Sequence, residues 1–550
     1  MDSLNTILNI LKVALGLGFV IFLHELGHFL LAKWNGVKVE KFSIGFGPTL
    51  LGFTKGETEY VIAALPLGGF VKMLGEGPEE EANKSTDPRA YPNKSVSARM
   101  AIISAGVIMN LILGLVCFVY AYGQGREEVP ARVGGVLAGS PAFEAGMRSG
   151  DHIVAIDDRR DLTYNNLTLK VRLSGKGQLL RFVVERPGTD DPLTFAIEPR
   201  RAVGADHPGI GIYPVHGLTF LDPPLISPAG LSSPYPADLF GLKPGDKIVA
   251  VGPVGEEPTP ISDSLGWEAI ISRHRDKPLT VIVAPASKEG TSTSPNRSVE
   301  LPVNHFVDFG FRLEADAISA IRAGSPAEKA GMRKGDRIVK VDGDAEFDPM
   351  RLPSLIQERA GSPVTIEVER PEPGSKPRLV SFTVTPDDTP PWVELAYPNE
   401  PLEVSGLGLA YPVRPKIVAV APGSPAEKAG LKAGDFLSAM TLPAMKIGEE
   451  ETEAVELTFG PDEPAWAFAW QLMQLRPLAP ISLTVNNATS PITVTPEPVS
   501  DWYHPQRGEQ FQLLFQKMPP LGAQAALHRG LEDTDDNILS IYALFRSLSQ

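Results

Sequence analysis

The stretch Phe22-Leu23-His24-Glu25-Leu26-Gly27-His28-Phe29 lies inside a long apolar segment near the amino terminus. Two histidines four residues apart occupy one face of a helix and can share a zinc ion. The glutamate beside the first histidine can polarise a zinc-bound water as a general base. The sequence therefore predicts His24 and His28 as metal ligands and Glu25 as the catalytic residue.

The surroundings of this motif favour a membrane span. Residues 13–32 form a twenty-residue, mostly apolar segment around it, and about twenty residues are needed for a helix to cross roughly 30 Å of hydrocarbon. Ionisable residues inside such a segment are costly and usually functional. A soluble core helix with hydrogen-bonded histidines is the alternative. It leaves unexplained a second segment, residues 100–122, which carries no charged residue.

The second apolar segment has its own pattern. Gly106, Asn110 and Gly114 recur every four residues, which predicts a face of small side chains for close helix packing. Asn110 either lines the active site or bonds to a neighbouring helix. The connecting residues 34–99 predict short strands at 37–44, 60–64 and 70–73, followed by an acidic solvated loop at 76–82.

Basic residues predict the orientation of the chain. Nine lysines and arginines lie in residues 33–99, against one in the first twelve residues. Because cytoplasmic loops are enriched in these residues, we expect 34–99 in the cytoplasm and the amino terminus outside. No basic region or small-residue cleavage site precedes the apolar stretch, so we interpret it as an uncleaved span.

An internal repeat dominates from Pro130 to about Ser500. Its copies are Gly139–Asp151, Gly324–Asp336, Gly423–Asp435 and, more weakly, Ser233–Asp246. Within each copy, Ser-Pro is expected to cap and begin a short helix, and glycine to end it. Gly-Asp then turns into an apolar strand such as 153–156 or 338–341.

Composition narrows the class of protein. With 550 residues the chain exceeds one domain, and the 52 glycines and 52 prolines suit many short strands joined by turns. The net charge of −15 argues against nucleic acid as a partner. Cys117 is the only cysteine, so no intramolecular disulfide forms and an exported region must be stable without one.

The motifs taken together closely resemble the site-2 protease family, in particular its bacterial regulator-of-sigma-E protease branch. The resemblance is carried, motif by motif over the first 125 or so residues, by the histidine motif, by Ser43–Pro48, by Leu65–Met73, and by Ala105-Gly106 with Asn110. The family has proline at the position of Val107, and this difference removes no chemical group from the site. The resemblance implies a zinc-dependent intramembrane endopeptidase of the bacterial inner membrane, with the repeats in the periplasm.

The same resemblance suggests substrates. They would be single-span membrane proteins, of the anti-sigma factor or remnant signal peptide type, already trimmed by another protease. In the family, residues 34–99 form a small membrane-associated sheet whose edge holds the substrate as an added strand, which satisfies the backbone groups of an unwound helix. The candidate substrate-binding residues are Gly45, Gly47, Gly68, Gly69 and Asn110; the alternative is that the glycines are ordinary turn residues.

The repeats resemble PDZ domains, four of them, at 130–201, 205–305, 308–387 and 404–500, with linkers near 200–208, 303–308 and 387–404. Such domains hold a peptide C-terminus by strand addition beside a glycine-rich turn. The candidate turns are 209–212, 309–311 and 406–409, one for each of the last three units, and the first unit has no clear equivalent. Their peptide-binding candidates are Gly209, Gly211, Gly310, Gly406 and Gly408. Spacers or steric filters without a peptide ligand are the alternative.

The predicted fold class is a multidomain membrane protein. Transmembrane α-helices at 1–33 and 100–122 enclose a small membrane-associated β segment at 34–99. An array of PDZ-like α+β domains follows, and then a juxtamembrane segment at 501–550 with an amphipathic helix, Ile538 to Leu548. The expected partners are single-span substrates, the lipid bilayer and peptide C-termini at the PDZ grooves, but no nucleic acid.

The third zinc ligand has no candidate in this sequence. In the resembled family it is an aspartate in a Leu-Asp-Gly motif on a later span; here Leu221-Asp222 is followed by Pro223. We expect the natural protein to continue past Gln550, and the 550-residue form to bind zinc weakly without proteolysis. A membrane-anchored PDZ scaffold with an inactive core is the rival function. A transporter is disfavoured, because two spans offer no inverted repeat.

Overall fold

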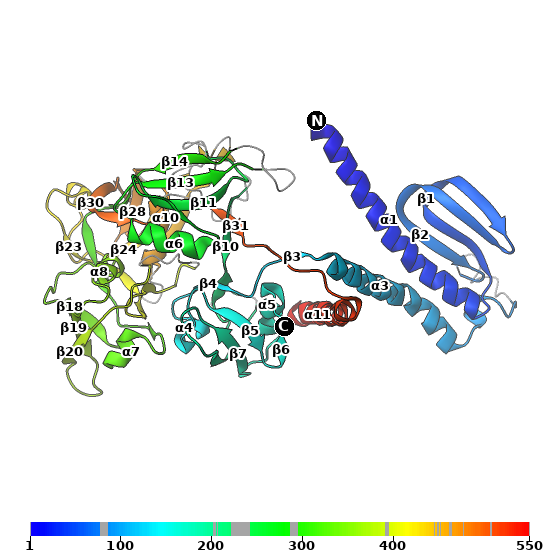
Figure 1. Cartoon of the computed structure of the whole chain (residues 1–550), viewed down its shortest axis with the longest axis horizontal. Coiled ribbons are helices and arrows are strands. Elements are labelled where there is room, and N and C mark those ends of the chain that lie inside the picture. The colour runs from blue at the N-terminus through cyan, green and yellow to red at the C-terminus, as the bar shows by residue number, and fades with distance from the viewer. Residues whose placement is uncertain are drawn as a thin grey trace. The chain divides into compact units, whose positions relative to one another are not determined.

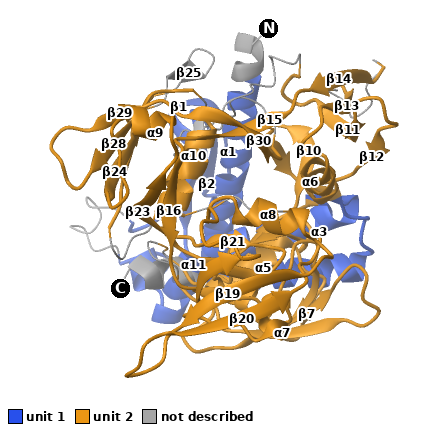
Figure 2. Ribbon diagram, turned by 90° about the vertical axis from the view of Figure 1, so that its left-hand side faces the viewer, with its two compact units in different colours: residues 1–127, 517–550 blue, residues 128–516 orange. Residues whose placement is uncertain are grey.

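The computed structural model describes most of the chain (Figure 1). The described residues are 2–76, 86–201, 205, 207–221, 242–286, 295–390, 395, 397–444, 446–447, 450–451, 453–460, 465–476, 478–506 and 509–548. Their contacts separate two compact units, which Figure 2 colours differently: residues 1–127 with 517–550, and residues 128–516. Each unit is described by itself.

The first unit is built on two long apolar helices. They are α1 (Asp2–Trp34) and α3 (Val96–Gln124), and the predicted apolar segments 13–32 and 100–122 lie inside them. By length and composition, Leu8–Trp34 and Val96–Gln124 could each cross a membrane. A short 3-10 helix, η1 (Tyr91–Asn93), precedes α3, and the Ser95 side chain caps α3 by accepting the Ala98 N–H.

Glycine allows α1 and α3 to cross closely. A methyl group on Gly27 would lie 2.5 Å from the Ala105 carbonyl oxygen and 3.1 Å from the Cβ of Met109, so only glycine permits this contact. The helices also share a small core with the neighbouring strands: Ala32, Val37, Val39, Phe42, Val71, Met73 and Ile102.

The segment between the helices is one curled hairpin, not the three short strands that we predicted. Its strands are β1 (Val39–Lys55) and β2 (Thr58–Met73). Residues 42–44 of β1 pair with 69–71 of β2 on one side and with 60–62 on the other. Positive φ angles at Gly45 and Gly47 interrupt β1, which lets the hairpin fold back on itself. Sequence patterns missed this because the strands continue through glycines that usually end them.

The carboxy-terminal helix α11 (Ala523–Leu548) begins fifteen residues before the predicted Ile538. It packs on α3: a methyl group on Gly530 would contact Leu115, Phe118 and Val119 at 3.3–3.4 Å. The buried Asp533 carboxylate accepts a hydrogen bond from the Tyr122 hydroxyl. The prediction of an amphipathic helix was therefore right in type and short in extent.

The second unit contains four related repeats. In the first, third and fourth repeats, a strand, a short helix and a strand are followed by a second helix and further strands. In the second repeat, residues 222–241 between the first two strands lie outside the described residues. The first repeat has β4 (Val133–Val136), α4 (Pro141–Ala145), β5 (His152–Ile156), β6 (Arg159–Arg160), α5 (Tyr164–Arg172), β7 (Leu180–Glu185), β8 (Leu193–Ile197) and β9 (Ile212–Pro214). The second has β10 (His216–Phe220), β11 (Lys247–Pro253), β12 (Thr259–Pro260), α6 (Ser264–Arg273), β13 (Leu279–Ala284), β14 (Arg297–Leu301) and β31 (Phe511–Leu513).

The third and fourth repeats follow the same plan. The third has β17 (Ala320–Ile321), α7 (Pro326–Ala330), β18 (Arg337–Val341), α8 (Leu352–Glu358), β19 (Val364–Arg370), β20 (Arg378–Val384), β21 (Leu402–Val404) and β22 (Leu409–Tyr411). The fourth has β15 (Asn304–Asp308), β16 (Phe311–Ala315), β23 (Val413–Val420), α9 (Pro425–Lys428), β24 (Leu437–Leu442), β25 (Lys446–Ile447), β26 (Glu450–Glu451), β27 (Val455–Thr458), α10 (Trp466–Gln474), β28 (Ile481–Val485), β29 (Ile492–Val494) and β30 (Glu497–His504). The short strands β3 (Glu127–Glu128) and β32 (Gln516–Lys517) lie at the unit boundaries.

The predicted helix start is confirmed in the three clear copies of the repeat signature, and the predicted glycine end in two of them. Ser140, Ser325 and Ser424 each cap a short helix with proline in its first turn, by accepting the N–H three residues later. Gly146 and Gly331 end two of these helices in the left-handed conformation. Most of the weaker copy, residues 233–241, lies outside the described residues.

In the first and third repeats, the aspartate of the Gly-Asp turn anchors the repeat. Asp151 and Asp336 are 0% and 1% exposed. Each pairs with an arginine, Arg186 just after β7 and Arg370 at the end of β19, at 2.7 Å between Nε and Oδ1. Each also accepts the N–H three residues before it. A buried carboxylate satisfied in this way fixes the turn that leads into the next strand.

The closing strands do not follow the predicted domain boundaries. β9 pairs with β4 and so completes the first repeat, although the boundaries 130–201 and 205–305 place it in the second. β31 (Phe511–Leu513) pairs with β10, so the second repeat is completed far along the chain from its last helix, which ends at Arg273. The segment 303–308, which we predicted as a linker, is largely strand β15, paired with β30.

The third repeat is nested inside the fourth. β16 pairs with β23, and the whole third repeat lies between these two strands in the sequence. The Asp316 N–H donates to the Pro412 carbonyl at 3.0 Å, and Arg414 pairs with Asp316 at 2.8 Å. These contacts therefore hold together the two points at which the chain leaves and re-enters the fourth repeat. We predicted four consecutive units, but the strand pairing interleaves the repeats along the sequence.

Candidate metal centre

The helix α1 brings the two histidines of the motif face to face. Their Nε2 atoms lie 3.1 Å apart, and their rings meet edge to face at 4.8 Å. Two nitrogens on one tetrahedral zinc ion, each at about 2.0–2.1 Å, are separated by roughly 3.3–3.4 Å. The observed spacing is within a few tenths of an ångström of that geometry, so His24 and His28 fit a shared zinc ion.

The tautomer of His28 is set from outside the motif. Its Nδ1 donates to the Ile102 carbonyl oxygen of α3 at 2.7 Å. With the proton on Nδ1, the lone pair of Nε2 faces His24 and is free for a metal. A backbone carbonyl behind a metal-binding imidazole is the usual second partner of such a ligand.

Asn110 stands behind the other histidine. Its side-chain amide lies 3.1 Å from His24 Nδ1, and its Oδ1 is buried without a hydrogen-bond partner. Rotating the amide by 180° places Oδ1 against Nδ1–H, which satisfies the orphan oxygen and frees His24 Nε2 for a metal. Of the two readings of Asn110, the geometry favours a place at the site.

Gly106 provides the space for the imidazole pair. A methyl group there would lie 2.5 Å from His28 Nε2 and 2.6 Å from His24 Nε2. Sequence reasoning identified Gly106 only as a helix-packing residue. Its position four residues before Asn110, on the face that meets the motif, is the signal that could have revealed this role.

One of the four hairpin glycines lies beside the catalytic candidate. A methyl group on Gly69 would be 3.2 Å from Glu25 Cγ and 2.8 Å from the Ser43 carbonyl oxygen. The other three, Gly45, Gly47 and Gly68, have φ angles of +88°, +90° and +133°, and so shape the hairpin as turn glycines do. The structure therefore brings Gly69 to the motif and gives the others a conformational role.

Glu76 is an acidic residue near the histidine motif. The sequence predicted it to lie in a solvated loop. Its Oε2 accepts the Met73 N–H at 3.3 Å. Partial burial raises the pKa of the Glu76 carboxyl, and the negative charge of Glu25 adds to the rise. Residues 77–82 of the predicted loop lie outside the described residues. Across the part of the chain that the structure describes, no group of three or more histidine, cysteine or acidic side chains could hold a metal.

The turn glycines of the repeats occupy equivalent places, but in repeats other than those predicted. Gly211, Gly310 and Gly408 have φ angles of +77°, +80° and +68°. A methyl group on each would lie 2.2–2.4 Å from the Cβ of a helix-capping serine: Ser140, Ser424 and Ser325 respectively. The turns therefore belong to the first, fourth and third repeats.

Hydrogen bonds support this reassignment. The Ala142, Ala426 and Ala327 N–H groups donate to the carbonyls of Ile210, Phe309 and Leu407 at 2.9–3.0 Å. The first repeat thus has a glycine turn, although the sequence pattern showed no clear equivalent for it. Of the remaining candidates, Gly209 has open space around its α-carbon, and a methyl group on Gly406 would touch Ile356 of α8 at 3.0 Å.

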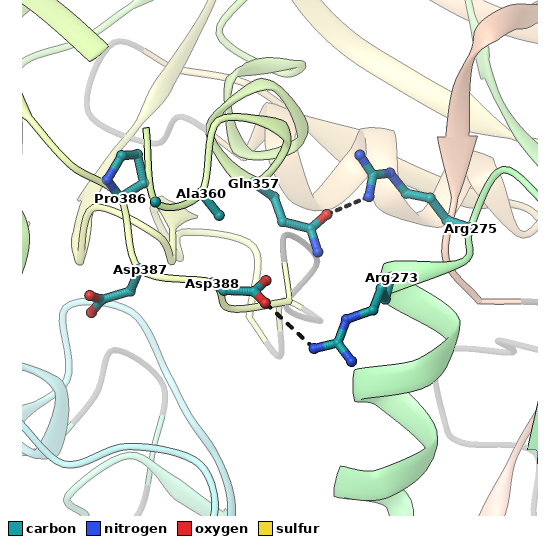
Figure 3. Close-up of a pocket in the computed structure, with 8 residues that line it drawn as sticks. Arg273, Arg275, Gln357, Ala360, Pro386, Asp387 and Asp388 are labelled. Carbon is teal, nitrogen blue, oxygen red and sulfur yellow. Dashed lines mark hydrogen bonds and ion pairs between the residues drawn. The ribbon is translucent and has the colours of Figure 1, made fainter. Parts of the chain in front are cut away.

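A separate cavity of about 510 Å³ lies in the second unit (Figure 3). Its charged walls are paired with one another: Arg273 with Asp388 at 3.5 Å, and Arg275 with Gln357 at 2.6 Å. Arg275 also pairs with Glu358 at 2.9 Å, and Asp387 with Arg148 at 3.7 Å. Each charged residue that lines the cavity therefore already has a partner within the second unit.

Two facing imidazoles on one apolar helix, with a glutamate between them in sequence and partners from a second helix behind them, define the class of HExxH metallohydrolase centres. Residues 12–495 match the family described as Peptidase family M50, and the chain belongs to that family. This confirms the resemblance to the site-2 proteases that the motifs indicated.

Curated relatives agree. Several relatives are named "Putative zinc metalloprotease". One in Clostridium acetobutylicum is 42% identical to this chain over 218 residues, which cover 40% of this chain and 60% of the relative. One in Clostridium perfringens is 39% identical over 34% of this chain and 54% of the relative. One in Neisseria meningitidis is 28% identical over 54% of this chain and 65% of the relative. The chain spans about half to two thirds of the length of these relatives.

Proposed function

We propose that this chain forms the zinc-binding core of an intramembrane endopeptidase that cuts single-span membrane proteins. The observation that carries the proposal is the pair of Nε2 atoms 3.1 Å apart on α1, each backed by a partner from α3. Membership of the M50 family and the names of the relatives support zinc as the metal. Two histidines leave two positions of a tetrahedral ion for a third protein ligand and water.

The residues of the motif would divide the chemistry. A bound zinc ion supplies a Lewis acid that polarises the scissile carbonyl and acidifies water. His24 and His28 hold the ion, with Asn110 and the Ile102 carbonyl fixing their rings. Glu25 takes a proton from the attacking water and later delivers it to the leaving amine nitrogen.

The hairpin would present the substrate. Residues 69–71 pair with β1 on one side, and Gly69 brings this part of β2 to Glu25. A peptide unwound from its helix can pair with such an edge and keep its backbone groups satisfied. The hairpin also carries exposed large apolar side chains, as a surface in contact with lipid would: Phe46, Leu50, Leu51, Phe53 and Leu65.

The location and partners follow from this proposal. The chain would lie in the bacterial inner membrane, with 34–99 cytoplasmic and the repeats periplasmic, where they would exclude substrates with intact bulky ectodomains. Substrates would be of the anti-sigma factor or remnant signal peptide type. The repeats would take peptide C-termini as an added strand beside their glycine turns.

The test is the zinc content of the purified chain, measured by elemental analysis in detergent. Because two histidines alone bind zinc weakly, the chain is first loaded with excess zinc. We expect zinc in the loaded unaltered chain, its loss in His24→Ala and His28→Ala, and its retention in Glu25→Gln. A chain that binds no zinc under any loading condition would support the rival function, a membrane-anchored PDZ scaffold with an inactive core.

A further inference from the structure

The third repeat differs from the others at the strand that follows its glycine turn. That strand, β22, pairs with β17 at one edge and with β21 at the other. The β21 pairing is antiparallel, with Leu402 opposite Tyr411 and Val404 opposite Leu409. Among the described residues, the corresponding strands β9, β16 and β31 each have a single strand partner. Within the described ranges, a second strand at this edge is thus a feature of the third repeat.

Strand β21 lies where a strand-addition ligand would lie, against helix α8. Leu402 and Val404, 8% and 0% exposed, belong to the same core as Leu352 and Ile356 of that helix. The methyl position of Gly406, two residues after β21, is 3.0 Å from Ile356 Cγ2. Alternate side chains of β21 thus fill the apolar groove, as alternate side chains of a bound peptide do.

The turn holds a carbonyl group of β21 where it would hold a carboxylate. The Val404 oxygen accepts the N–H of Leu407 at 3.0 Å and of Gly408 at 2.9 Å. Backbone N–H groups of a glycine turn are the part of such a groove that captures a peptide C-terminus. Val404 therefore stands at the position of a last residue, and Leu402 two positions before it.

The residue between them is fixed by a buried ion pair. Glu403 is 6% exposed and accepts from Arg322 Nη1 at 3.3 Å. Arg322, also buried, donates from Nη2 to the Ser405 carbonyl at 2.9 Å. Breaking one partner of a buried pair strands the other charge and is costly, so this contact holds β21 in place.

We propose that Leu402-Glu403-Val404 is an internal ligand of the third repeat, which occupies the groove between β22 and α8 and keeps a free peptide out. This inference rests on the strand-addition role proposed for the repeats. The occupant also defines the class of peptide that would fit an emptied groove: a free C-terminus with aliphatic residues at the last and third-last positions and an acidic residue between them.

The test uses the full chain in detergent and a fluorescent peptide ending in Leu-Glu-Val-carboxylate with a photo-crosslinking residue upstream. Val404→Asp places a charge in the apolar groove and should release β21. We expect at least a tenfold gain in peptide affinity over the unaltered chain, and crosslinks that map to residues 352–358. Leu379→Asp is the matched control, because Leu379 is 57% exposed on β20 of the same repeat, and it should behave like the unaltered chain.

An equal yield of crosslinks at 352–358 in the unaltered chain and in Val404→Asp would overturn the proposal. If Val404→Asp does not fold, the near-isosteric Val404→Thr replaces it. Hydrogen exchange at 402–404 no faster than in the unaltered chain, with no gain in crosslinking, would then refute the internal ligand.

The result also separates this inference from the functions on which it builds. Crosslinks to α5 of the first repeat alone, in every variant, would leave strand addition intact and refute only the internal ligand. An absence of crosslinks to any repeat would refute strand addition itself. Zinc content reports on the metal centre independently of both.

Discussion

A single methyl group at Gly106 should disable the metal centre. In Gly106→Ala the new Cβ would lie 2.5 Å from His28 Nε2 and 2.6 Å from both Cε1 and Nε2 of His24, where ordinary contacts begin at 3.4 Å. The rings must therefore retreat by about 0.9 Å, or the helices must separate. Separation is opposed by the close contact of Gly27 with the Ala105 carbonyl.

The size of the effect follows from that displacement. Ligand sets must be held within about 0.5 Å of their working geometry, and a misplacement near 1 Å costs about a hundredfold. We therefore expect zinc affinity to fall by one to two orders of magnitude, equivalent to about 1.4–2.8 kcal/mol.

The assay is competition for zinc between the purified chain and a chromophoric chelator in detergent. Gly114→Ala is the matched control, because it adds the same methyl group to the same helix, and nothing beyond the adjoining backbone of that helix lies within 4 Å of the new Cβ. It should leave zinc affinity unchanged. Helix content by circular dichroism should be equal in both variants.

Two results would refute this reasoning. Wild-type zinc affinity in Gly106→Ala would mean that the imidazoles do not hold the metal in the observed arrangement. An equal loss in Gly114→Ala would mean that the effect comes from helix packing rather than from the histidine pair.

Three further predictions concern other residues. Glu25→Gln should keep zinc and abolish cleavage of a single-span substrate by the active enzyme; substantial residual turnover would contradict its role as the base. Asn110→Leu should weaken zinc binding ten- to a hundredfold through loss of the His24 partner, with no change expected if Asn110 only packs helices. Burial and the Asp308 charge raise the pKa of Asp348 to about 7, above its unfolded value near 3.9. The folded state then holds the extra proton, so stability should fall as pH rises from about 4 to about 7. Asp348→Asn should flatten this fall in thermal melts at pH 5 and pH 8; an unchanged slope would show that the carboxyl does not titrate there.

The local structural features of this protein could be predicted from its sequence. The four-residue spacing of His24 and His28 depends only on helical geometry, and the apolar segments around it and at 100–122 depend only on composition. The serine caps at Ser140, Ser325 and Ser424 bond to groups three residues away. Such features are set by neighbours within one turn, so a pattern of a few residues is enough to predict them.

Long-range pairing was decided only in three dimensions. β31 completes a repeat that begins at β10, and β16 completes one that continues at β23 after a whole inserted repeat. Gly106 acquires its role from imidazoles on another helix, and β21 from a groove formed by β22 and α8. A strand's pattern shows which face is buried but not which edge it joins. The partner is chosen by packing between distant segments, which leaves no trace within either one.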